Sequence, residues 1–134
     1  MTLNLTRQAI DLGIVIRESE PMLAFYRDTL GFTHEGDAPM PGDGVMHRLR
    51  CGDSLIKLVR SGRIPEAANP PGGIGGATGM RYWTIHVSNL EDVAKACESA
   101  GYKLAVTPRE FRPGVWIAIV EDPEGNWVEF AQGG

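Results

Sequence analysis

Residues 122–130 read Asp-Pro-Glu-Gly-Asn-Trp-Val-Glu-Phe, and this stretch says most about the fold of the chain. Asp-Pro-Glu-Gly is typical of a tight turn, and the residues that follow alternate between polar and apolar, as in a strand with one buried face. Residues 115–121 before the turn are also strand-like. The stretch therefore predicts two strands joined by a short turn.

Working outward, the second half of the chain has the order strand, helix and three strands. The helix follows Asn89 and is stopped by Gly101, which is the usual position of glycine after a helix. The first half has the same order, with a helix that starts near Pro21 and ends at Gly31. The predicted strands cover residues 9–17, 32–35, 45–51 and 54–60 in the first half, and residues 81–87, 102–106, 115–121 and 126–131 in the second.

Corresponding residues of the two halves lie at a nearly constant separation, which indicates a duplicated module. The separation is 71 for Ile16 and Val87, 70 for Gly31 and Gly101, and 72 both for the Pro41-Gly42 and Pro113-Gly114 pairs and for Lys57 and Glu129. We therefore expect one α+β domain over residues 1–134, with module one at about 8–60, a linker at 61–79 and module two at 80–132.

The linker contains a glycine-rich stretch, residues 69–79. A phosphate-binding loop would follow a strand and open a helix, and it would end in Gly-Lys-Ser or Gly-Lys-Thr. This stretch precedes a strand and lacks that ending. We expect a flexible linker or lid.

Composition excludes several classes of partner. The chain of 134 residues has a formal net charge of −4 and no basic cluster, which argues against nucleic acid and anionic membranes. Charged residues at positions 7, 11 and 17 interrupt the apolar block that a signal peptide needs, so we expect a cytoplasmic protein. Cys51 and Cys97 are expected to be free thiols.

Two strings give a family resemblance. FYRDTLGF at residues 25–32 and DPEGNWVEF at residues 122–130, together with Ile14-Val15-Ile16, resemble the module signatures of the vicinal oxygen chelate superfamily. It includes glyoxalase I, the bleomycin and fosfomycin resistance proteins, extradiol dioxygenases and methylmalonyl-CoA epimerase. The resemblance spans about residues 10–131. It implies two tandem βαβββ modules that form a curved mixed sheet, a half-open cup with helices on its convex side, and it suggests a homodimer.

The resemblance also places metal ligands at Asp11, Lys57, Tyr82 and Glu129. Only Glu129 matches the usual ligand type, and a protonated lysine has no lone pair to offer. No metal or other cofactor is therefore expected. A divalent metal held by Asp11 and Glu129 is the alternative.

Strand alternation supports the same placement without the family. In each of the four strands an apolar set occupies one face, and a polar set is left on the other. The polar set consists of Asp11, Lys57, Tyr82, Thr84, His86 and Glu129. His47 shares its face with Val45 and Leu49, which predicts a packed or partly exposed histidine.

We expect a small-molecule enzyme of lyase or isomerase type that acts on a carbonyl compound through an enolate-like intermediate. Lys57 would stabilise the oxyanion, and Glu129, Tyr82 or His86 would move the proton. Arg109 and Arg112, in a loop at 107–113, are candidates for pairing with an anionic ligand.

Three alternatives remain. One is a metal-dependent enzyme of the glyoxalase or dioxygenase type. Another is a drug-sequestering protein whose groove contains Trp116 and Trp127 beside Tyr82. The third is a salt-bridge cluster without chemistry.

Overall fold

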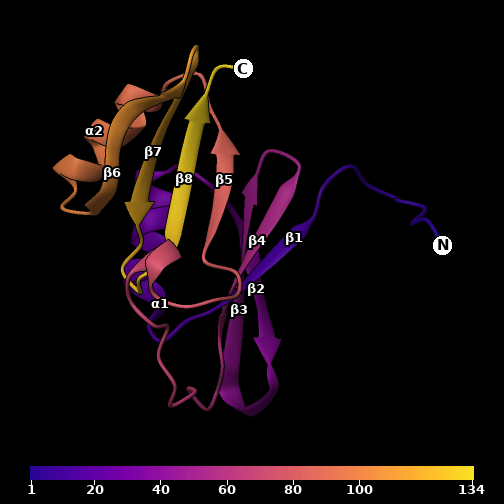
Figure 1. Ribbon diagram of the computed structural model, residues 1–134. Coiled ribbons are helices and arrows are strands. Elements are labelled where there is room, and N and C mark those ends of the chain that lie inside the picture. The colour runs from indigo at the N-terminus through magenta and orange to yellow at the C-terminus, as the bar shows by residue number, and fades with distance from the viewer. The chain divides into compact units, whose positions relative to one another are not determined.

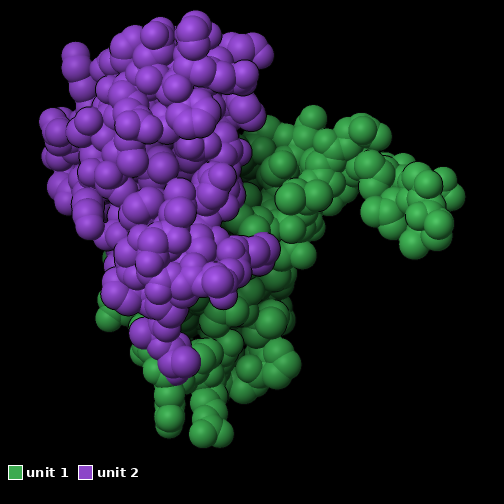
Figure 2. All heavy atoms as spheres, viewed as in Figure 1, with its two compact units in different colours: residues 1–66 green, residues 67–134 purple.

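The computed structural model describes residues 1–134 as two compact units, residues 1–66 and residues 67–134 (Figure 2). Each unit holds one four-stranded sheet in the chain order strand, helix and three strands, so the predicted α+β fold of tandem βαβββ modules is confirmed. In unit 1 the elements are β1 (Asp11–Val15), α1 (Ser19–Leu23), the π-helical η1 (Ala24–Thr29), β2 (Thr33–Met40), the short 3-10 turn η2 (Pro41–Asp43), β3 (Gly44–Cys51) and β4 (Ser54–Arg60). In unit 2 they are the 3-10 turn η3 (Gly73–Gly75), β5 (Tyr82–His86), α2 (Leu90–Ser99), β6 (Lys103–Arg112), β7 (Val115–Glu121) and β8 (Trp127–Gln132).

Unit 1 has the strand order β1-β4-β3-β2, with β1 parallel to β4 and the other pairs antiparallel. Its helical segment buries one face, and the apolar residues of the sheet that alternate away from Lys57 are also buried. The buried apolar side chains are Ile16, Met22, Leu23, Phe25, Tyr26, Phe32, Leu49, Leu55, Ile56 and Leu58, of which Leu55 alternates in phase with Lys57. Burial on this face leaves the opposite face of the sheet for polar groups.

The helix of unit 1 changes its winding halfway. It begins at Ser19 as an α-helix and continues as η1, where the amide of Leu30 donates to the carbonyl of Phe25, five residues back. Gly31 then adopts φ 81°, which ends the helix. The helix is confirmed, but its periodicity did not indicate the wider π-helical turn.

Strand β2 is longer than predicted. It pairs with β3 from Thr33 to Met40, with a bulge between His34 and Gly36, whereas the sequence indicated a strand only over 32–35. Because β2 is an edge strand, it tolerates Pro39 and an unpaired residue.

Unit 2 has the order β5-β8-β7-β6, and α2 covers one face of this sheet through contacts with β6, β7 and β8 (Figure 1). Asn89 lies at the N-cap of α2 as predicted, but its side chain makes no capping hydrogen bond. The amide of Leu90 instead donates to Oε1 of Gln132 at 2.8 Å. The helix is therefore tied to the end of β8.

Strand β6 corrects another prediction. Residues 107–113, which contain two prolines, are predicted as a loop. In the structure β6 continues through Arg112, with three register shifts against β7. Pro108 falls within one of these shifts on an edge strand, where a missing amide proton costs little.

The turn between β7 and β8 is organised by Asp122, whose residue exposure is only 3%. Its Oδ1 accepts from the amides of Glu124 and Asn126 at 2.9 Å each, and its Oδ2 accepts from Asn126 Nδ2 at 2.9 Å. A buried carboxylate with several donors explains why this turn begins with aspartate.

The glycine-rich stretch differs from the flexible linker that was expected. Arg81 Nε donates to the Gly73 carbonyl at 2.7 Å, and its Nη2 donates to the Pro70 carbonyl at 2.6 Å. Asn69 also donates to the Glu124 carbonyl at 3.3 Å. The stretch is therefore held in place within unit 2, because two of its backbone carbonyls accept hydrogen bonds from the guanidinium of Arg81.

The two cysteines are free, as expected, and burial raises the pKa of Cys97 to about 11. None of the helices combines the length and apolarity that crossing a membrane requires.

Candidate functional site

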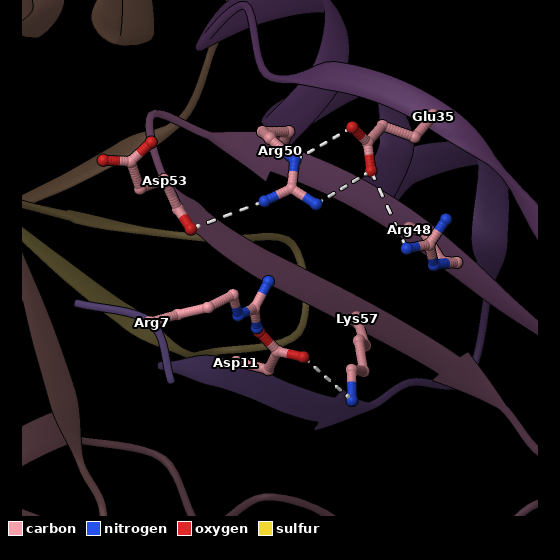
Figure 3. Close-up of polar contacts among 7 residues, drawn as sticks. All are labelled: Arg7, Asp11, Glu35, Arg48, Arg50, Asp53 and Lys57. Atoms are coloured by element: carbon pink, nitrogen blue, oxygen red, sulfur yellow. Dashed lines mark hydrogen bonds and ion pairs between the residues drawn. The ribbon is translucent and has the colours of Figure 1, made fainter. Parts of the chain in front are cut away.

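The polar face of unit 1 contains the predicted pair Asp11 and Lys57. They project from the adjacent parallel strands β1 and β4, and Nζ of Lys57 lies 3.4 Å from Oδ2 of Asp11 (Figure 3). The other carboxylate oxygen, Oδ1, accepts a hydrogen bond from Arg7 at 2.7 Å. The structure thus brings this lysine and this carboxylate together, as alternation predicted.

These contacts set the charge of Asp11. Partial desolvation would raise the pKa of Asp11, but hydrogen bonds from Arg7 and Lys57 outweigh it and hold the pKa below its ordinary value. Asp11 is therefore ionised near neutral pH, and its carboxylate lies beside Lys57 as a counter-ion.

Three further charged residues of this face were not predicted. Arg50 of β3 binds Glu35 through Nε and Nη2 at 2.9 and 3.0 Å, and Arg48 Nη2 lies 3.8 Å from Glu35 (Figure 3). Arg48 is the register partner of Lys57. A signal was present, since Arg48 and Arg50 alternate with His47 and Leu49. Glu35 gave none, because it lies at the bulge.

The polar face of unit 2 contains Glu129 and Thr84, which are register partners on β8 and β5. Thr84 Oγ1 donates to Glu129 Oε1 at 2.7 Å, so one carboxylate oxygen is held while Oε2 remains available to a ligand. Tyr82 and His86 lie on the same face of β5, and both are exposed. The unit 2 members of the polar set therefore share one face.

Trp127 also lies on the face of Glu129, but its ring is already occupied. Its Nε1 donates to Glu121 Oε1 at 3.1 Å, and a Cβ on Gly73 would overlap the ring. The indole is packed under the glycine-rich stretch, which is the structural role that tryptophans in a small strand-rich protein most often have.

Trp116 does not share that face. It is the register partner of Gln132, which alternates with Glu129 and so points to the opposite side of the sheet. There it lines a shallow hollow of about 180 Å³ with Leu90, Glu91 and Gln132. The aromatic groove expected from Trp116, Trp127 and Tyr82 is therefore not formed within unit 2.

Arg109 and Arg112 are exposed on β6, not in a loop. Their register partners on β7 are Ile117 and Val115, and Ile117 in turn pairs with Ala131. Since Ala131 alternates in phase with Glu129, both arginines belong to the polar face of unit 2.

Comparison with known proteins identifies the family of the chain. Residues 10–130 match the family model of the Glyoxalase/Bleomycin resistance protein/Dioxygenase superfamily. The chain belongs to this superfamily. The match confirms the resemblance drawn from the two module signatures, while no curated protein matches the chain.

Solved structures of the superfamily share the fold. A glyoxalase family protein from Bacillus cereus has a TM-score of 0.82 at 17% identity, with 98% of this chain and 96% of that chain covered. A glyoxalase family protein from Enterococcus faecalis has a TM-score of 0.68 at 20% identity, with 96% of each chain covered. The trypanothione-dependent glyoxalase I of Leishmania major has a TM-score of 0.72 at 17% identity, with 95% and 87% covered.

The resemblance implied metal ligands at Asp11, Lys57, Tyr82 and Glu129, and the donors present do not fit a divalent ion. The ammonium of Lys57 points at Asp11 across 3.4 Å and offers no lone pair while protonated. A cation bound there would face this positive charge at close range. The position that should coordinate a metal in unit 1 is thus filled by a cationic side chain.

Proposed function

We propose that the chain is a metal-independent lyase or isomerase of the superfamily, acting on a small carbonyl compound through an enolate-like intermediate. The observation that carries the proposal is the ion pair of Lys57 with Asp11, at 3.4 Å, on the strands where the superfamily places metal ligands. An ammonium held by a carboxylate supplies positive charge without a metal, and positive charge is what a developing enolate requires.

The chemical step needs a base as well. Glu129 is the candidate base for taking the proton from the carbon next to the carbonyl. The C–H electron pair would form the C=C bond, and Lys57 is the candidate group for stabilising the charge left on the carbonyl oxygen. Return of the proton to another position gives an isomerase, and loss of a leaving group gives a lyase. The hydrogen bond from Thr84 orients the Glu129 carboxylate and leaves its second oxygen for the proton.

The surroundings of Lys57 favour a substrate that also carries a carboxylate. Besides Lys57, the group of charged side chains in Figure 3 includes the cations Arg7, Arg48 and Arg50, in a protein whose net charge is −4. Arg48, the register partner of Lys57, reaches Glu35 only at 3.8 Å and is the cation of the group with the longest ion-pair distance. It is the group most readily redirected to an anionic ligand.

Proton exchange tests the proposal even while the product is unidentified. A panel of small 2-oxo and 3-oxo carboxylic acids is incubated with the protein in D₂O, and deuterium uptake next to the carbonyl is followed by NMR. We expect uptake for at least one compound, unchanged by a chelator. K57M and E129Q should each slow it about 100-fold or more.

The matched control is K95M, because Lys95 is exposed on α2. K95M should retain the wild-type rate, and K57R should retain more activity than K57M. Exchange that requires added metal, or that survives in K57M, would refute the role given to Lys57.

A further inference from the structure

Two histidines and an aspartate converge in unit 1 outside the polar face just described. Nε2 of His34 and Nδ1 of His47 are both within hydrogen-bond distance of Oδ1 of Asp37, at 2.6 and 2.8 Å. These two nitrogens and this oxygen all lie within 4.8 Å of one another. His47 alternates with Arg48, the partner of Lys57, so this cluster is on the helix side of the sheet.

The bulge in β2 creates this convergence. His34 and Asp37 are three residues apart, and in a regular strand they would point to opposite faces. The bulge adds one residue between them, so that His34 pairs with Leu49 and Asp37 pairs with His47, which are two residues apart on β3. Gly36, at the bulge, has φ 145°, a conformation that other residues rarely adopt.

From this geometry we infer that His34, Asp37 and His47 form a binding site for a divalent metal ion of the zinc type. Two imidazole nitrogens and one carboxylate oxygen are the donors that Zn²⁺ and similar ions take in open sites, at about 2.0 to 2.2 Å. For each of these ring nitrogens to bind the ion through its lone pair, its proton must lie on the other ring nitrogen, and its hydrogen bond to Asp37 Oδ1 is then given up. Small movements suffice, because the ligand atoms already lie close together.

The groups behind the site suit this role. Nε2 of His47 lies 2.8 Å from Oγ of Ser19, the first residue of α1. A serine hydroxyl accepts as well as donates, so it can accept a hydrogen bond from Nε2–H when Nδ1 binds the ion. Such a partner behind a metal-binding histidine fixes both its tautomer and its orientation.

Exposure increases from the back of the site to its front. The side chains of His47, His34 and Asp37 are 7%, 23% and 47% exposed, respectively. The ion would therefore rest against a buried imidazole and keep its remaining positions open to water. A site with three protein ligands and open positions is typical of catalytic rather than structural zinc.

The same contacts allow an alternative interpretation as a catalytic triad. Ser19 would be the nucleophile, His47 its base, and Asp37 the carboxylate that orients the base. That assignment gives His34 no role, although His34 makes the shorter of the two contacts to Asp37. A metal ion uses all three side chains of the cluster. We therefore favour the metal.

Titration of the full chain with Co²⁺ tests the inference, with Zn²⁺ as competitor. We expect one ion per chain, visible absorption bands from a coordinated Co²⁺, and displacement by Zn²⁺. H34A and D37N should each weaken binding at least 100-fold, and S19A about tenfold, the lower end of the range for outer-shell partners. H86A is the matched control, because His86 is the remaining histidine and lies in unit 2.

NMR of the imidazole nitrogens in the Zn²⁺-loaded protein gives a readout that does not depend on activity. His34 should coordinate through Nε2 and His47 through Nδ1. Circular dichroism checks that H34A and D37N remain folded, since both residues are less buried than His47. Absence of stoichiometric binding, binding unchanged in H34A and D37N, or covalent labelling of Ser19 by a serine-directed probe in a protein that binds no metal would overturn the inference.

This inference does not rest on the proposed function, and the two can fail separately. D37N removes the metal site without altering Asp11 or Lys57, and K57M does the opposite. Metal binding should therefore persist in K57M. The chelator-resistant exchange proposed for Lys57 should persist in D37N.

Discussion

Lys57 helps to set the pKa of the carboxylate beside it. The pKa of Asp11 is held below its ordinary value of 3.8, because the hydrogen bonds from Arg7 and Lys57 outweigh the partial desolvation that would raise it. Since the folded-state pKa lies below the unfolded one, the stabilisation is fully present above the unfolded pKa. It is lost as the pH falls through the folded pKa.

We therefore expect K57M to move the pKa of Asp11 upward, toward its ordinary value, while Arg7 still holds it partly down. Carboxyl-carbon NMR across the acid range measures this directly. In K57M the loss of stability on acidification should also be smaller and should be complete at a higher pH, because the folded pKa lies closer to the unfolded one. The same titration in K95M is the control, and an Asp11 pKa that is identical in K57M and wild type would show that the 3.4 Å contact has no electrostatic effect.

Single residues were predictable where alternation was regular. Asp11 and Lys57 could be placed on one face because Leu12, Ile14, Ile56 and Leu58 mark the other. The cluster of His34, Asp37 and His47 was missed for the opposite reason. A spacing of three in a strand predicts opposite faces, and nothing in the sequence except Gly36 indicates a bulge.

At the level of elements, the glycine-rich stretch gives a sharp test of packing. Gly73 has φ 53°, and a Cβ there would overlap the ring of Trp127. G73A should lower the free energy of unfolding by roughly 1 to 3 kcal/mol through overpacking, with strain from the positive φ in addition. Urea denaturation followed by tryptophan fluorescence measures both the stability and the ring's environment.

Gly75 supplies the control for this test. It lies in the same turn, a Cβ added to it would meet no atom within 4 Å, and it lacks a positive φ. G75A should leave stability within about 0.5 kcal/mol of wild type. Equal effects of G73A and G75A would mean that the stretch does not pack on Trp127.

Some elements could not have been predicted at their true length or orientation. Strand β7 is buried on both faces after Trp116, so it shows no alternation from which the direction of Trp116 could be read. Strands β2 and β6 are edge strands that run through prolines and bulges. A proline usually leads to the prediction that a strand ends, because proline cannot donate a backbone hydrogen bond. That expectation holds for central strands but not for edge strands.

For the whole molecule, the homodimer implied by the superfamily remains a prediction. Unit 1 exposes several large apolar side chains at and before β1, namely Leu3, Leu5, Ile10 and Val15, and such side chains are often covered by a second chain. Light scattering should give about twice the chain mass of 14.6 kDa. A mass of one chain across the micromolar range would refute the dimer, and V15K should shift the equilibrium toward single chains.

The π-helical turn and the bulges also record how the two modules diverged. The separation between corresponding residues falls from 71 at Ile16 and Val87 to 70 at Gly31 and Gly101. The segment that contains the helix of unit 1 is therefore one residue longer than the corresponding segment of unit 2. The π-helical η1 lies in this longer segment. The separation then rises to 72 at Pro41 and Pro113, and β6 has three register shifts where β2 has one.

Each gained or lost residue since the duplication is thus accounted for by one local irregularity, and the strands beyond it keep their register. A module that tolerates insertions in this way can acquire new side-chain constellations without refolding. The bulge that brings His34 beside Asp37 shows this, because β6 has a register shift at the corresponding position, between Leu104 and Val106. The side chains placed around the bulge, and not the bulge itself, distinguish unit 1.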